Sequence, residues 1–168
     1  MKPYNETKLA QELIRFPTIK TEDKGIMKFL SKKLTAIGFK CTIIKSKGTG
    51  TNPALNLYAR YGKSKPHIMY LGHTDVVANL DNWKFPPFKA VVSKGYLYGR
   101  GAQDMKGGIA CWISAVSNFI KNNKYKGSIS IIISADEETT GYGCPAVMKY
   151  LKKKGEKIDF SVVGEPSS

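Results

Sequence analysis

The first forty residues place apolar side chains at the spacing of an amphipathic helix in two stretches. Residues 5–15 and 21–37 each carry apolar positions three or four residues apart, which fall on one side of a helix. Asn5 can cap the first stretch, Pro17 follows its end, and Gly38 lies just past the end of the second. The pattern therefore predicts two helices, each with one face buried.

The next two segments alternate between apolar and polar residues. Residues 39–45 would turn Phe39, Cys41 and Ile43 inward, and residues 55–59 alternate in the same way. A period of two residues is typical of a strand with one buried face. We expect two half-buried strands here.

The second half of the chain changes from alternation to short continuous apolar runs. Three runs, at residues 68–71, 129–133 and 160–163, indicate strands that are buried on both faces. Helical stretches at residues 107–122 and 144–154 separate these runs. Strands and helices that alternate in this way predict right-handed crossovers and parallel pairing.

These elements together predict an α/β fold. We expect three layers, with a largely parallel mixed sheet flanked by helices, and a hairpin of residues 90–92 and 97–98 inside the first crossover. The length of 168 residues fits one domain or a large part of one, and no segment has the composition of an interdomain linker.

Lysine dominates the charge of the chain. The 27 Lys and Arg residues outnumber the 13 Asp and Glu residues, which leaves a formal net charge of +14. Only Arg15, Arg60 and Arg100 are arginines, the residue type suited to bidentate contacts with phosphates and bases. Scattered lysines therefore argue against a nucleic-acid partner, although a positive field would attract an anionic substrate.

The sequence also argues against a membrane or an oxidising compartment. It has no apolar run of roughly 20 residues, the length that a membrane helix needs, and no signal-peptide pattern at its start. Cys41, Cys111 and Cys144 show neither a disulfide framework nor zinc-knuckle spacing, so we interpret them as buried small hydrophobic residues. We expect a soluble, cytoplasmic protein.

Acidic residues gather after the three predicted buried strands. Ligands of open α/β sheets bind beyond the carboxyl ends of the strands, so these residues are expected to lie along one rim. Six of the 13 acids and one histidine hold such positions: His73, Asp75, Asp104, Asp136, Glu137, Glu138 and Glu165.

A cluster of this composition predicts a metal site. Neighbouring carboxylates repel one another, and a divalent cation removes that penalty. One imidazole with several carboxylates and no thiolate suits zinc, cobalt or manganese. Glu137 and Glu138 could divide the work of ligand and base, and Asp75 could orient the ring of His73. Each residue alone also fits a strand-end cap or a solvated loop, and His67, at the opposite end of its strand, is interpreted as structural.

Four ordered motifs resemble the dizinc aminoacylase/carboxypeptidase family of metallohydrolases. They span residues 71–77 (LGHTDVV), 98–108 (YGRGAQDMKGG), 136–138 (DEE) and 164–168 (GEPSS). The resemblance covers nearly the whole chain. It implies a zinc-exopeptidase-like catalytic domain and a metal-dependent hydrolase whose substrate is a small dicarboxylate amide. Another deacylase, a dipeptidase of the same family and a non-catalytic remnant are the alternatives.

The resemblance also implies roles by matched position. Glu137 would be the general base and later the proton donor, and Asp75 would orient His73. The peptide bond between Asp104 and Met105 would be cis. Asp104 would bridge two metal ions, which are Zn²⁺ with Co²⁺ as an alternative. The implied ligands are His73, Asp104, Glu138 and Glu165.

The family's catalytic domain continues beyond the last of these motifs. In the family a lid and dimerisation domain follows the Gly-Glu-Pro motif, and the chain then returns to the catalytic domain with one more metal-binding histidine. We therefore expect residues 1–168 to be the N-terminal portion of that domain. We also expect at most one tightly held metal, low or no activity for these residues alone, and a homodimer for the complete family enzyme.

Overall fold

The main sheet of the protein has five strands in the order β1-β2-β6-β3-β7. The computed structural model describes residues 3–49, 51–78 and 81–167, so Ser168 of the last motif lies outside the described residues. The strands of this sheet are β1 (Lys40–Ser46), β2 (Ala54–Tyr61), β3 (His67–His73), β6 (Ser128–Ser134) and β7 (Phe160–Val163).

The sheet is mixed, as the sequence predicts. β3 pairs in parallel with β6 on one side and with β7 on the other, which confirms the parallel crossovers. β2 runs antiparallel to both β1 and β6. Within this sheet the parallel pairing involves β3 with its two neighbours, and the two alternating strands join as an antiparallel edge.

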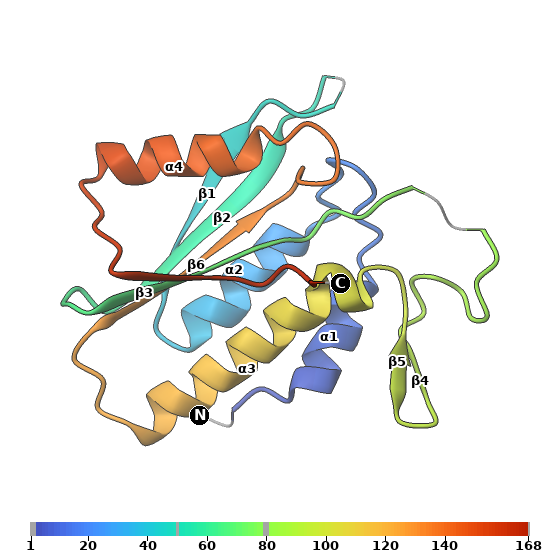
Figure 1. Ribbon diagram of the computed structural model, residues 1–168, viewed down its shortest axis with the longest axis horizontal. Coiled ribbons are helices and arrows are strands. Elements are labelled where there is room, and N and C mark those ends of the chain that lie inside the picture. Colours follow the sequence, from blue (N-terminus) through green and yellow to red (C-terminus); the bar gives the residue numbers. More distant parts are fainter. Residues whose placement is uncertain (1–2, 50, 79–80, 168) are drawn as a thin grey trace.

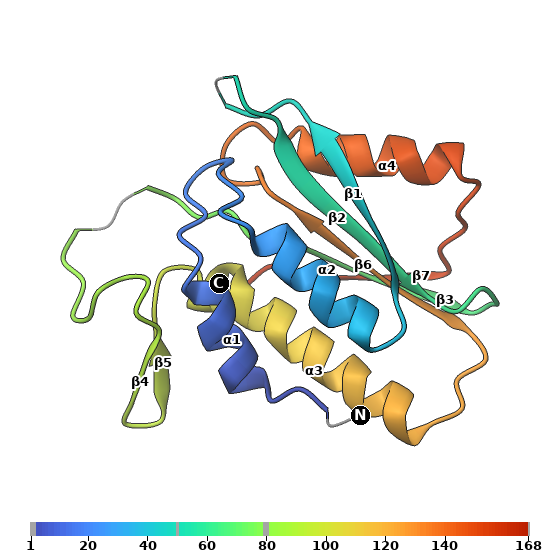
Figure 2. The ribbon, with the colours of Figure 1, turned by 180° about the vertical axis from the view of Figure 1, so that it is seen from behind.

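Helices cover both faces of the sheet and make three layers (Figures 1 and 2). Three helices lie on one face: α1 (Glu6–Ile14), α2 (Ile26–Ala36) and α3 (Gly107–Asn122). α4 (Gly143–Lys153) lies on the other. Strand alternation decides which core a residue joins, since Ile131 and Ile133 pack with the first group of helices and Ile132 packs with α4.

Local chemistry explains where the first two helices begin. Asn5 caps α1 as predicted, because its Oδ1 accepts the Lys8 N–H at 2.9 Å. The second helix begins at Ile26, five residues later than the pattern predicted. The carboxylate of Asp23 accepts the N–H groups of Gly25 and Met27. The residues just before Ile26 therefore form a non-helical turn and do not extend the helix.

Two expectations about burial were wrong. β7 is exposed, with 63% of Phe160 and 58% of Val163 accessible, because within the described chain only β3 pairs with it. The cysteines are not buried either: Cys111 is exposed, and Cys41 and Cys144 are half-buried. Cys111 lies outside the buried stripe of α3, which shows that its apolar neighbours were not evidence for its own burial.

Two smaller elements complete the described chain. β4 (Val91–Ser93) and β5 (Tyr96–Tyr98) form the predicted hairpin, which projects from the body of the molecule (Figure 1). A short irregular turn, η1 (Ala102–Lys106), leads into α3. Among the helices that the structure describes, none combines the length and the apolar character that crossing a membrane demands.

Candidate metal centre

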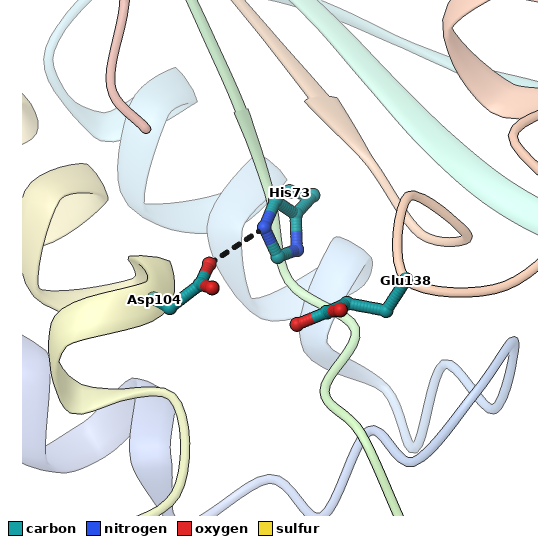
Figure 3. A group of neighbouring side chains, drawn as sticks. All are labelled: His73, Asp104 and Glu138. Carbon is teal, nitrogen blue, oxygen red and sulfur yellow. Dashed lines mark hydrogen bonds and ion pairs between the residues drawn. The ribbon is translucent and has the colours of Figure 1, made fainter. Parts of the chain in front are cut away.

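The centre is built around His73, which ends β3 and is almost completely buried. Its Nε2 lies 2.9 Å from Oδ1 of Asp104, which comes from the irregular turn η1 (Figure 3). Asp104 has extended backbone angles inside that turn, and its peptide bond to Met105 is cis, which confirms the expectation drawn from the resemblance. The turn thereby points a carboxylate at the imidazole.

Two glutamates approach the same imidazole nitrogen. Glu165, just after β7, has Oε1 3.5 Å from Nε2 of His73, and Oε2 of Glu137 lies 3.9 Å from it. Two groups of side chains that share His73 could each hold a metal ion, because within each group the donor atoms lie within 4.8 Å of one another. One group is His73 with Asp104 and Glu138, and the other is His73 with Glu137 and Glu165. The structure thus brings together every ligand and base candidate named from the sequence.

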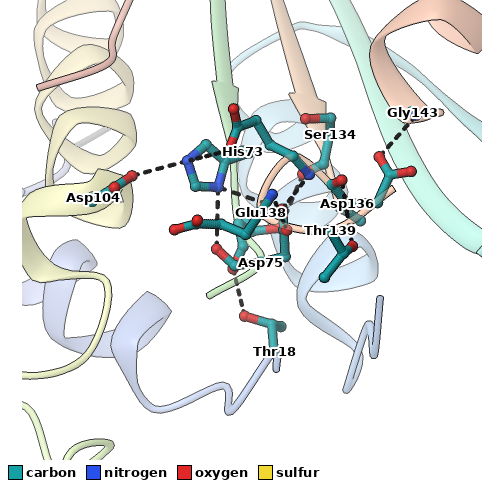
Figure 4. Close-up of polar contacts among 12 residues, drawn as sticks. Thr18, His73, Asp75, Asp104, Ser134, Asp136, Glu138, Thr139 and Gly143 are labelled. Atoms are coloured by element: carbon teal, nitrogen blue, oxygen red, sulfur yellow. Dashed lines mark hydrogen bonds and ion pairs between the residues drawn. The ribbon is translucent and has the colours of Figure 1, made fainter. Parts of the chain in front are cut away.

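Asp75 connects the imidazole to the glutamates. Its Oδ1 lies 3.4 Å from Nδ1 of His73, on the side of the ring that faces away from Asp104 (Figure 4). The same carboxylate accepts the N–H of Glu137 at 3.1 Å and of Glu138 at 2.9 Å. Sequence reasoning predicted the contact with His73 but missed the two amide contacts, because residue spacing within one strand carries no information about a loop 62 residues away.

Asp136 is separated from the cluster and shapes the loop that carries the glutamates. It is fully buried, and its carboxylate accepts the N–H groups of Tyr142 and Gly143, each at 2.8 Å. A Cβ at Gly143 would lie 2.4 Å from Oδ1 of Asp136 and 2.3 Å from Oδ1 of Asn56, so only glycine fits there. Asp136 is therefore structural, and it leaves Glu137 and Glu138 at the surface of the loop.

Electrostatics favour a cation at this point. Burial alone would lower the pKa of His73, but the hydrogen bond and charge of Asp75, with the charges of Glu165 and Asp104, raise it to about 9. Burial and the charge of Asp104 raise the pKa of Glu138, and burial raises that of Glu165. Each of the two overlapping groups, an imidazole with two carboxylates, is a donor set that fits a divalent cation.

Comparison with known proteins identifies the family. The sequence model described as peptidase family M20/M25/M40 matches residues 69–168, more than half of the chain. The chain belongs to this family. Its motifs had already indicated the resemblance, which is confirmed.

Two curated relatives of this M20/M25/M40 chain are named succinyl-diaminopimelate desuccinylase. The protein from Pelagibacter ubique (strain HTCC1062) is 52% identical over 172 residues, which cover 100% of this chain and 45% of the relative. The protein from Ehrlichia chaffeensis (strain ATCC CRL-10679 / Arkansas) is 45% identical, with 95% of this chain and 42% of the relative covered. The chain thus spans less than half the length of these relatives.

Solved structures show the same fold. Human carnosine dipeptidase 1 matches with a TM-score of 0.83 at 22% identity, over 97% of this chain and 38% of that one. The M20 family metallo-carboxypeptidase Sso-CP2 from Sulfolobus solfataricus matches with a TM-score of 0.82 at 21% identity, over 98% and 38%. The expected α/β fold, with a mixed sheet flanked by helices, is therefore confirmed for this chain.

A hollow of about 560 Å³ opens beside the centre of this M20/M25/M40 chain. Asp104 and Glu138 line the hollow, so a molecule bound there would lie next to two of the candidate metal ligands. Val76 and Leu97 supply apolar surface, and the guanidinium of Arg100 stacks 5.0 Å from the ring centre of Trp83. The hollow is large enough for a small organic substrate.

Metal binding to this site is expected to release a proton and to weaken in acid. A ligating imidazole must be neutral, whereas the raised pKa of about 9 keeps metal-free His73 protonated at pH 7. Between pH 6 and 8 the affinity for Co²⁺ should rise by about tenfold per pH unit. Calorimetric titration in two buffers of different ionisation enthalpy should find about one proton released per ion at pH 7.

The opposite dependence is expected for the stability of the metal-free fold. Because folding raises the pKa of His73 from its ordinary 6.5 to about 9, protonation stabilises the folded state. That contribution is fully present below the unfolded value and is lost as the pH rises through about 9. A Co²⁺ affinity that stays constant from pH 6 to 8 would contradict both expectations.

Proposed function

We propose that this chain carries the metal-binding and proton-transferring residues of an amide hydrolase. The observation that carries this proposal is the convergence of the His73 imidazole with Asp104, Glu137, Glu138 and Glu165 beside a hollow of substrate size. Membership of the M20/M25/M40 peptidase family supports hydrolysis as the reaction class. Zinc is the proposed ion, and cobalt(II) is the alternative, because both suit one imidazole with carboxylates.

The proposed reaction removes the succinyl group of N-succinyl-LL-diaminopimelate, giving succinate and LL-diaminopimelate, a step of lysine biosynthesis. The printed names of the two relatives support this substrate. By resemblance within the family, residues 83–88 and 97–106 and the ending Gly-Glu-Pro-Ser-Ser favour a desuccinylase over other deacylases and dipeptidases. The positive net charge of +14 also favours an anionic substrate.

The residues of the centre have separable tasks in this reaction. A bound divalent cation would polarise the amide carbonyl and lower the pKa of a water molecule. Glu137, whose side chain is 53% exposed, takes a proton from the attacking water and later gives it to the amine nitrogen as the C–N bond breaks. Asp75 holds Nδ1 of His73, so that Nε2 stays directed at the site of the ion.

The length of the relatives supports a proposal about the whole protein. We propose that residues 1–168 are the N-terminal portion of the catalytic domain and that a lid and dimerisation domain and the remaining catalytic segments complete it. By themselves these residues would hold at most one metal tightly and show little or no turnover. The complete enzyme is proposed to be a cytoplasmic homodimer that binds neither nucleic acid nor membrane.

A chimera tests the proposed substrate. This chain would replace the matching 45% of the Pelagibacter ubique relative, and the purified chimera would be loaded with Zn²⁺ or Co²⁺. We expect kcat/KM for N-succinyl-LL-diaminopimelate to exceed that for N-acetylornithine and for a dipeptide by about 100-fold or more. A preference for either competitor would reassign the reaction within the family, and a metal-loaded chimera inert toward all three would identify a non-catalytic remnant.

A further inference from the structure

A short N-terminal segment lies against the part of the chain that carries Asp75. Ile19 forms a parallel bridge with Val76, in which the Val76 N–H donates to Thr18 O at 3.0 Å and the Lys20 N–H donates to Val76 O at 3.2 Å. The Thr18 hydroxyl also donates to the carbonyl of Thr74. The position of Asp75 therefore depends on a segment more than 50 residues earlier.

Lys106 ties this segment to the other side of the centre. It lies two residues after Asp104 and is fully buried, and its Nζ donates to the carbonyl of Phe16 at 2.8 Å. Phe16 O also accepts the Thr18 N–H at 2.9 Å, so one carbonyl joins Lys106 to the bridging segment. The turn that holds Asp104 is thereby linked to the segment that holds Asp75.

The turn that carries Asp104 also packs directly against Val76 and Lys106. A Cβ at Gly101 would lie 2.9 Å from Cγ1 of Val76 and 3.3 Å from Cδ of Lys106, so the turn before Asp104 rests directly on both. Asp104 faces Nε2 of His73, and Asp75 faces Nδ1. If the turn that carries Asp104 moved relative to the segment that carries Asp75, the angle between the imidazole of His73 and these carboxylates would change.

We propose that Lys106 is a positioning residue of the metal centre: through Phe16 and Thr18 it sets the placement of Asp75, and so of Glu137 and Glu138, relative to Asp104. This inference rests on the metal site of the proposed function. Burying a polar amine is costly, and an apolar side chain of similar length would fill the same space. The amine therefore contributes a directed hydrogen bond to Phe16 O that packing alone would not provide.

The test compares metal binding with stability in the 168-residue chain. Lys106→Met keeps the length of the side chain and removes its bond to Phe16. We expect the dissociation constant for Co²⁺ to rise by about tenfold to a hundredfold, as for other residues that orient metal ligands. We also expect the visible absorption bands of bound Co²⁺ to shift, while the urea midpoint of the metal-free protein stays close to that of the parent.

Lys33→Met is the matched control. Lys33 is partly buried, whereas Lys106 is fully buried, and its Nζ donates to Glu12 Oε2 at 2.8 Å; it contacts no residue of the centre in the part of the chain that the structure describes. Its removal should leave Co²⁺ affinity and spectrum unchanged. Should Lys106→Met not fold, Thr18→Val replaces it. This change removes the hydroxyl bonds to Thr74 O and Phe16 O, and we expect Co²⁺ affinity to fall several-fold.

The outcomes separate two failures. A parent chain that does not bind Co²⁺ would overturn the proposed metal site, and this inference with it. A parent chain that binds Co²⁺ while the Lys106→Met or substitute Thr18→Val protein keeps the same affinity and spectrum would overturn only the positioning role. A stability loss without a spectral change would likewise mean that Lys106 is merely structural.

Discussion

Replacing Glu137 by Gln in the chimera should lower kcat for amide hydrolysis by about 100-fold to 10,000-fold, with KM and metal content little changed. The amide of glutamine keeps the shape of the side chain but cannot take a proton from water. The Asp75 carboxylate binds the backbone N–H of residue 137, and this contact does not depend on the side chain, so the loop should keep its position. Steady-state kinetics and metal analysis of the purified variant measure both effects.

Glu138→Gln is the matched control for this prediction. Glu138 is the adjacent carboxylate on the same loop, and its backbone N–H is held by the same Asp75 side chain. Glu138 is a candidate metal ligand together with His73 and Asp104, so its replacement should lower the metal affinity as well as the rate. If Glu137→Gln kept kcat within tenfold of the parent, or lost its metal, Glu137 would not be the proton-transfer group.

Replacing His73 by Ala should have the largest effect on metal binding, a loss of Co²⁺ affinity of at least about 100-fold. His73 belongs to both candidate groups of ligands, so no alternative set in the described chain retains an imidazole. The metal-free fold should also lose about 3 kcal/mol of stability, because buried Asp75 is left without its cationic partner. Calorimetry with Co²⁺ and urea unfolding in a chelator measure the two losses.

His67→Ala provides a control on the same strand. His67 is equally buried, but it lies at the start of β3, where its ring contacts Lys157 O at 2.9 Å and Ser130 Oγ at 2.8 Å. Its removal should lower stability without changing Co²⁺ affinity, in agreement with the structural role that the sequence indicated. Equal losses of affinity in the two variants would show that the effect of His73→Ala arises from general destabilisation and not from lost ligation.

The elements that the sequence predicted well are those with strong local signals. Continuous apolar runs located β3 and β6, alternation located β1 and β2, and the hairpin was found from its central glycine. The acidic residues beyond these strands were also found, because parallel strands bring their carboxyl ends to one rim whatever the details of packing. The role of each acid was less visible, since Asp136 has the same local sequence signal as Glu137.

Other features had no local signal. The burial of β7 was overestimated. A run of apolar residues shows that a strand is suited to burial, but it does not show whether other elements pack against that strand. Nothing in the sequence around Thr18 indicates that it supports residues 74–76, and the Lys106 side chain was missed because a lysine in a glycine-rich turn usually faces solvent. Both contacts join segments more than 50 residues apart.

The order of residues alone was sufficient to determine the α/β framework and the identity of the metal-binding candidates. Periodicity and strand-end chemistry are local properties, and the amino-acid types carry them directly. Only the tertiary structure decided which carboxylates converge on His73, that Asp136 turns away, and that one carboxylate, Asp75, supports both the imidazole and the two glutamates. Those outcomes depend on distances of a few ångströms between segments that meet only when the sheet and its helices have packed.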